Sequence, residues 1–255
     1  MKKTNGQSLC IFSSKGGVGK TTCLLNLAGV FSLQEKKVLI VDFDLTSGAV
    51  CTYLGLKPQK TIYHLVDDLN NHRFNDVENY ITSYHKNIDV LSSCLDPRQA
   101  TLIDPNYIEI ILEKCQNKYD VVLIDTNHHL NEFNACLLDQ VDSRLIVVTN
   151  DLIDIKNTYN LIKIFNDNDV DNFKLLLNES VFPNKKYYSL YDIKSVIKNN
   201  IDYTIGSGFH LKTFDVYVAE GIILTLEKKM PMVYPQVYKT FLTICKDVME
   251  NNNEK

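Results

Sequence analysis

The chain has 255 residues, of which 45% are hydrophobic and 23% are charged, and its formal net charge is −4. This size and composition suit one large α/β domain with a buried core, and the acidic balance argues against a protein that coats nucleic acid by charge alone. The first residues form no apolar signal sequence and no stretch reaches the roughly 18 apolar residues of a spanning helix, so we expect no membrane-spanning segment.

Apolar runs alternate with helical patterns along the chain. Strands are predicted at Ser8–Ser13, Val38–Phe43, Ile88–Leu91, Val121–Asp125, Leu145–Thr149 and Phe173–Leu177. Helices are predicted at Lys20–Gln34, Thr61–Leu69, Asn106–Lys118, Asn131–Asp139 and Asp154–Asn166. Continuous Val, Ile and Leu runs are typical of strands buried on both faces. The pattern therefore predicts a doubly wound α/β fold with a mostly parallel sheet and helices on both faces, as a single domain (residues 1–250) followed by a disordered tail (251–255).

The most informative motif joins the first strand to the first helix, where residues 13–22 read S-S-K-G-G-V-G-K-T-T. A glycine-rich turn at this place leaves backbone N–H groups aimed at one point, and the helix dipole and the Lys20 ammonium reinforce the attraction for phosphate. The Thr21 hydroxyl is the group that such loops offer to Mg²⁺. We therefore predict a protein that binds a nucleoside triphosphate through Gly16, Gly17, Val18, Gly19, Lys20, Thr21 and Thr22.

Acidic residues follow two of the predicted strands. The second strand ends in V-D-F-D, and alternation along it would place Asp42 and Asp44 on one side, near the phosphate-binding loop. The run from Tyr119 to Asp125 contains four consecutive apolar residues, 121–124, and ends in an acid, which is typical of a strand that delivers a carboxylate to Mg²⁺. Asp42 and Asp125, with Thr21, are the predicted metal ligands.

The K-G-G-V-G-K-T-T sequence that starts at Lys15 resembles the deviant phosphate-loop ATPases of the MinD/ParA superfamily. The resemblance implies ATP and Mg²⁺ as cofactors and a homodimer formed with ATP, in which Lys15 reaches the nucleotide of the other subunit. It also implies that Asp44 positions the attacking water and that Asp42 supports it. Asn178, at the end of the L-L-L-N run, is then the residue that reads adenine; a helix cap or turn is the alternative for this asparagine.

The segment 126–130 departs from that family. It reads T-N-H-H-L, where the family usually has a proline and a glycine in a mobile loop. This difference leaves two hypotheses open, a hydrolytic ATP-dependent dimerisation switch and a non-hydrolysing scaffold that stays bound to nucleotide. For His128 and His129, solvent-facing positions are favoured over metal binding.

Within the superfamily, residues 41–56 and 119–162 resemble the TadZ/CpaE branch, which positions Tad-type pilus or secretion machinery. The resemblance implies a cytoplasmic protein that partners recruit to a cell pole or to the inner membrane surface. The alternative is a ParA-like or MinD-like partitioning or positioning ATPase.

Three further sequence patterns bear on DNA binding, membrane binding and cofactor chemistry. Lysines at 185, 186, 194 and 198 leave DNA binding as a less favoured alternative. The apolar positions of the last helical pattern, from Tyr234 to Val248, favour core packing over membrane binding. Seven cysteines without a C-x-x-C pair predict a reducing compartment, and a shared iron–sulfur cluster at Cys94 and Cys136 is disfavoured because neither lies in a glycine-rich setting.

Overall fold

The computed structural model describes residues 6–182, 188–210 and 214–250. These residues form an eight-stranded sheet with the strand order β3-β4-β2-β5-β1-β6-β7-β8. Neighbouring strands are parallel, except that β3 runs antiparallel to β4. The strands are β1 (Gln7–Phe12), β2 (Val38–Asp42), β3 (Ile81–His85), β4 (Ile88–Leu91), β5 (Val121–Asp125), β6 (Ser143–Val148), β7 (Phe173–Asn178) and β8 (Tyr203–Ile205).

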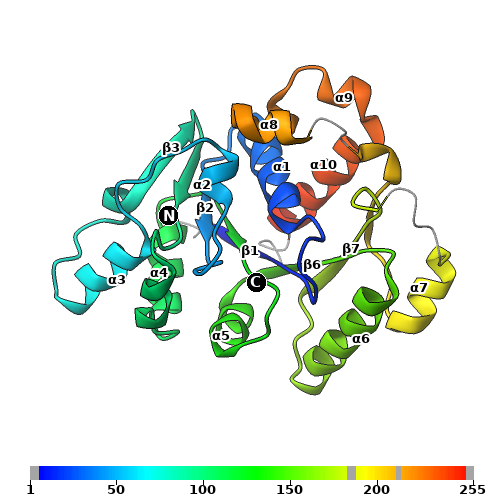
Figure 1. The fold of residues 1–255 in the computed structure, drawn as a ribbon, viewed down its shortest axis with the longest axis horizontal. Helices are drawn as coiled ribbons and strands as arrows, with labels where there is room; N and C mark the ends of the chain where they lie inside the picture. The colour runs from blue at the N-terminus through cyan, green and yellow to red at the C-terminus, as the bar shows by residue number, and fades with distance from the viewer. Residues whose placement is uncertain (1–5, 183–187, 211–213, 251–255) are drawn as a thin grey trace.

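Helices cover both faces of the sheet (Figure 1). On one face lie α1 and α10, and on the other lie α4, α5 and α6. The helices are α1 (Lys20–Leu33), α2 (Val50–Tyr53), α3 (Ile62–Asn70), α4 (Tyr107–Gln116), α5 (Glu132–Gln140), α6 (Leu152–Asp167), α7 (Leu190–Ile197), α8 (Phe214–Glu220), α9 (Met230–Val233) and α10 (Pro235–Glu250). The predicted doubly wound, mostly parallel α/β fold is therefore confirmed.

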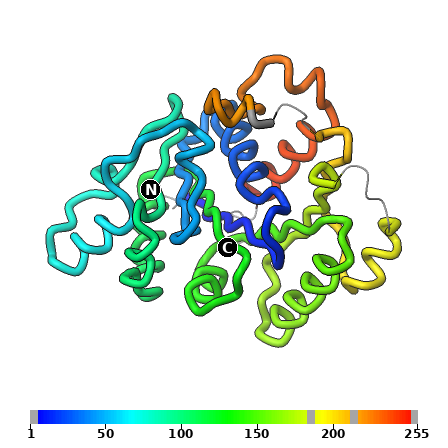
Figure 2. The backbone as a smooth tube through the Cα atoms, in the orientation of Figure 1, coloured from blue at the N-terminus to red at the C-terminus, as the bar shows by residue number. Residues whose placement is uncertain are grey.

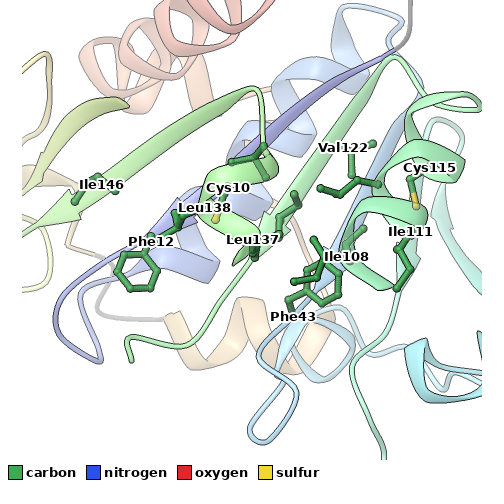
Figure 3. Close-up of a cluster of buried hydrophobic side chains, with 14 of the residues drawn as sticks. Cys10, Phe12, Phe43, Ile108, Ile111, Cys115, Val122, Leu137, Leu138 and Ile146 are labelled. Carbon is green, nitrogen blue, oxygen red and sulfur yellow. The ribbon is translucent and has the colours of Figure 1, made fainter. Parts of the chain in front are cut away.

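Two apolar cores lie on the two faces of the sheet because side chains alternate along each strand. In β1, Cys10 and Phe12 pack against α5 on one face (Figure 3), whereas Leu9 and Ile11 pack toward α1 on the other. The first and last helices of the chain lie side by side in the second core (Figure 2). All of β1 is buried, so its carboxyl end is a rigid support for the loop that follows.

The predicted strands and helices agree with the structure to within about two residues, and the differences have local causes. Helix α6 begins at Leu152 rather than Asp154, because the Asp151 side chain caps it by accepting the N–H groups of Ile153 and Asp154. The predictions missed β3, β8 and the helices α2, α7, α8 and α9. Strand β3 reads I-T-S-Y-H and is only partly buried, so it lacks the continuous apolar run of the central strands.

The predicted apolar face of the last helix is confirmed as core, since Val237, Phe241, Cys245 and Val248 are buried in α10. In the described part of the chain, no helix is long and apolar enough to cross a membrane. The tail 251–255 and the lysines at 185 and 186 lie outside the described residues, and the single-domain assignment stays a prediction.

Candidate nucleotide-binding site

The phosphate-binding loop connects β1 to α1 at the carboxyl edge of the sheet. Gly17 and Gly19 have φ angles of 73° and 91°, in the left-handed region that disfavours side chains with a Cβ. Gly19 is also packed so closely that an added Cβ would lie 2.7 Å from Nδ2 of Asn178. The glycines predicted from sequence are therefore needed for the shape of the loop.

A cavity of about 570 Å³ opens in front of this loop. Of the predicted phosphate-binding residues, Val18 is buried and does not line the cavity. The others do, together with Asp44 and Asn178: Gly16, Gly17, Gly19, Lys20, Thr21 and Thr22. Such a volume accommodates a nucleotide-sized ligand. The fold thus brings residues that follow β1 and β2, and the last residue of β7, to one cavity.

Lys20 lies at the first position of α1, and its side chain is buried. Its Nζ donates a hydrogen bond to Oγ of Ser13 at 3.0 Å. Burial lowers the pKa of Lys20, and the negative charge of Asp125 opposes this shift. A buried ammonium that neighbours the loop N–H groups is suited to bind a phosphate, whose charge would compensate the cost of burial.

Asp125, at the end of β5, has an unused acceptor beside the loop. Its Oδ2 accepts a hydrogen bond from Oγ1 of Thr21 at 2.6 Å. Its Oδ1 is buried and has no hydrogen-bond partner among the described residues. Burial raises the pKa of Asp125, while the Thr21 hydrogen bond lowers it. An orphaned carboxylate oxygen next to a threonine hydroxyl is a donor set that fits Mg²⁺, which prefers oxygen ligands.

Asp42 and Asp44 have different environments, although they are two residues apart. The two oxygens of Asp42 accept the backbone N–H groups of Asp44 and Val50, each at 3.2 Å, and burial raises the pKa of Asp42. Asp44 lines the cavity, and its Oδ1 accepts the N–H of Ser47. Strand β2 ends at Asp42, so the expected alternation does not extend to Asp44. Asp42 holds the segment that carries Asp44, and its role as a metal ligand stays a prediction.

Lys15 is not among the residues that line the cavity. Its Nζ lies 3.0 Å from Oδ1 of Asp151 and 5.6 Å from the centre of the Phe182 ring. The preceding residue, Ser14, hydrogen-bonds to Asp154 and Thr158 of α6. The start of the loop is therefore attached to α6 within the same chain.

Asn178 lies at the end of β7, beside the loop, as predicted. Its Nδ2 donates to the carbonyl of Val18 at 2.9 Å, and its Oδ1 accepts from the N–H and the hydroxyl of Ser180. These contacts support the loop. The recognition of adenine by hydrogen bonds from this amide stays a prediction.

Sequence reasoning missed several residues of the cavity. His128 and His129 both line it. The predicted solvent-facing position holds for the exposed His129, whereas His128 is half-buried. The other missed residues include Thr46, Ser47, Thr126 and Asn127, which follow β2 and β5, and also Tyr53, Ser180, Val181, Phe209 and His210. They lie in α2 and in loops without a recognisable motif, and the pairing of β7 with β8 brings the last four together. No group of three or more His, Cys, Asp and Glu side chains in the described residues could hold a metal ion, and Cys94 and Cys136 are free thiols.

A glycine-rich phosphate loop, a buried lysine and a strand-end carboxylate at the carboxyl edge of a parallel sheet define a phosphate-loop nucleotide-binding protein. Residues 6–178 match the AAA domain family. The chromosome-partitioning ATPase Soj of Treponema pallidum is 26% identical over 86% of this chain and 85% of its own length. The septum site-determining protein MinD of Helicobacter pylori is 28% identical over 60% of this chain and 57% of its own.

Solved structures have the same fold. The ParA family ATPase from Chlorobium tepidum TLS superposes with a TM-score of 0.81 at 18% identity, covering 96% of this chain and 99% of that one. MinD of Pyrococcus horikoshii OT3, complexed with Mg-ADP, gives a TM-score of 0.76 at 20% identity over 95% and 96% of the two chains. The chain belongs to the AAA domain family, within the MinD/ParA superfamily of ATPases.

Proposed function

We propose that this protein binds ATP with Mg²⁺, hydrolyses it slowly, and uses the bound ATP to hold two copies of the chain together. The observation that carries the proposal is that one cavity is lined by the phosphate loop, the buried Lys20 and Asp44, and that Thr21 in its lining donates a hydrogen bond to Asp125.

Each residue has a role that follows from its chemistry. The loop N–H groups and the Lys20 ammonium bind the phosphates and stabilise the charge that develops on them. Thr21 and Asp125 would hold Mg²⁺, which neutralises phosphate charge when it is bound. Asp44 lies in the cavity as an acceptor that can orient a water molecule for attack, and Asp42 fixes the segment that carries Asp44.

The role of Lys15 rests on its place outside the cavity. Its partner Asp151 is a half-buried carboxylate, and such an ion pair is worth only about 1 kcal/mol or less. A nucleotide bound by a second copy would offer Lys15 several negative charges in place of one. We therefore propose that Lys15 leaves Asp151 and completes the partner's site when ATP is bound.

The cellular role is proposed from the relatives. Soj is named for chromosome partitioning, and MinD for determining the septum site. A complex of MinD with the protein MinC has the same fold in its MinD chain. These names support a partitioning or positioning ATPase that acts in the cytoplasm and is recruited to its location by a protein partner. The TadZ/CpaE role in pilus assembly, with recruitment to a pole, and DNA binding both stay predictions.

ATP turnover of the wild type beside Asp44→Ala tests the hydrolytic proposal. We expect measurable phosphate release by the wild type and a loss of about 100-fold in the variant, because the group that orients water is removed. Ser47→Ala, beside Asp44 in the same cavity, is the matched control. Equal rates in wild type and Asp44→Ala would contradict hydrolysis at this site and favour the non-hydrolysing scaffold.

A further inference from the structure

We propose that His128 donates a hydrogen bond to the terminal phosphate of the bound nucleotide and so makes the site prefer a triphosphate over a diphosphate. The inference rests on the proposed ATP binding and adds to it a residue that determines specificity. His128 lines the same cavity as Lys20 and Asp44 and comes from the segment 126–130, which departs from the family pattern.

The two ends of the phosphate loop face different groups, and this fixes the direction of the nucleotide. A Cβ added to Gly19 would contact Asn178 and Val181, whereas a Cβ added to Gly16 would lie 3.3 Å from two atoms of the His128 ring. Val181 lies at the Gly19 end, and Nδ1 of His210 lies 3.1 Å from the carbonyl oxygen of the adjacent Ser180, so this end offers apolar and aromatic surface suited to a base. The terminal phosphate then lies at the Gly16 end, beside His128.

The backbone on each side of the His128 ring is held in place. The Asn127 side chain accepts hydrogen bonds from the N–H of His129 at 2.9 Å and from Nδ2 of Asn134 at 2.8 Å. The same Nδ2 donates to the carbonyl of His129 at 2.7 Å. Asn134 is buried in α5, which packs against the sheet. Because this turn is tied to a core helix, His128 is positioned before the nucleotide arrives, which reduces the entropy cost of the contact.

The charges around His128 also suit a phosphate contact. Burial lowers the pKa of His128, the neighbouring His129 and Lys20 lower it further, and Asp44 acts in the opposite direction. A neutral imidazole still has one N–H donor. Asp44 brings negative charge to the same end of the cavity, so a donor there offsets its repulsion of a terminal phosphate. A nucleoside triphosphate gains the hydrogen bond from His128, whereas a diphosphate lacks the terminal phosphate that would accept it.

Titration calorimetry with Mg-ATPγS and Mg-ADP tests the proposal on the full chain. His128→Leu keeps an apolar group over Gly16 but has no donor, and His128→Gln has a donor. We expect about a tenfold loss of affinity for ATPγS in His128→Leu, because a hydrogen bond to a charged group is lost, with less than a twofold change for ADP. His128→Gln should recover part of the loss. His85→Leu is the control, because His85 is exposed on β3 and does not line the cavity, and it should bind both nucleotides like the wild type.

The possible results distinguish a failure of this inference from a failure of the proposed function. Equal weakening of ATPγS and ADP binding in His128→Leu would mean that the ring only supports the loop and would overturn the inference, as would unchanged affinity for both. In either case, binding of ATPγS by the wild type would leave the proposed function standing. A wild-type protein that binds neither nucleotide would overturn both.

Discussion

The phosphate loop, residues 13–22, and the segment 126–130 face each other across one cavity, yet they differ in how they are built. The loop depends on backbone geometry, with glycines at φ angles of 73° and 91° and N–H groups at the start of a helix. The segment 126–130 depends on side chains, with Asn134 holding the turn and His128 over Gly16. The first region is shaped by its own backbone, whereas the second is a turn that α5 holds in place.

We therefore expect the binding of nucleotide and the response to the bound nucleotide to be separable. The groups that attract phosphate are consecutive in the chain and rest on a fully buried strand. The groups that would sense the terminal phosphate lie on another strand end and are positioned by α5. Substitutions in the phosphate loop and in the segment 126–130 should therefore affect nucleotide binding differently.

The largest effect is expected on the loop side, from Lys20→Ala. Loss of the ammonium should weaken ATP binding by about 100-fold or more, because a buried charge–phosphate contact disappears. Binding of a fluorescent ATP analogue measures the change, and Lys239→Ala, an exposed lysine on α10, is the control. Wild-type affinity in Lys20→Ala would show that the cavity binds nucleotide without its loop.

A smaller effect is expected on the other side, from Asn134→Ala. Asn134 is 1% exposed and donates two hydrogen bonds into the turn at 127–129. Its loss should lower the free energy of unfolding by about 1–3 kcal/mol, because both hydrogen bonds from the buried Asn134 to the turn are lost. Urea denaturation measures this value, with Asn160→Ala on the exposed side of α6 as control.

Nucleotide binding by Asn134→Ala also tests whether the two sides of the cavity act separately. If the two sides are separable, Asn134→Ala should retain most of its affinity for ADP while its affinity for ATPγS falls. An equal loss for the two nucleotides would show that the turn supports the whole site.

The smallest effect is expected from a change of pH, which should alter the free energy of unfolding. Burial, and to a smaller extent His129 and Lys20, lower the pKa of His128 in the folded chain, so the unfolded chain takes up this proton more readily. The stability from the neutral imidazole is present above the ordinary histidine pKa of about 6.5 and is lost as pH falls below it. The difference in unfolding free energy between wild type and His128→Leu, measured without nucleotide at pH 7.5 and pH 5.5, should shift against the wild type at the lower pH. A difference independent of pH would contradict the lowered pKa.

Much of the fold and part of the site could be predicted from the sequence, for physical reasons. Central strands such as β5 are buried on both faces, so they appear as continuous apolar runs, whereas the edge strand β3 mixes polar and apolar residues. Lys20 and Asp125 were found because a motif and a strand end mark them.

The rest of the cavity depends on contacts between distant segments. Phe209 and His210 reach it because β8 pairs with β7, and no local pattern reports that pairing. His128 follows Asp125 by three residues, but its place over Gly16 depends on the hydrogen bonds from Asn134. In the sequence, the unusual T-N-H-H-L segment was the one feature that could have pointed to His128.

The most direct test of the central claim is molar mass by light scattering with Mg-ADP and with Mg-ATP, for the wild type and for Lys15→Ala. We predict a monomer with ADP, a dimer with ATP, and a monomer with ATP in Lys15→Ala, while Lys239→Ala behaves like the wild type. The Lys15→Ala variant should still bind nucleotide, because Lys15 does not line the cavity of its own chain. A wild-type mass that is the same with either nucleotide would contradict the ATP-dependent dimer, and an ATP-bound dimer of Lys15→Ala would contradict the role of Lys15 in it.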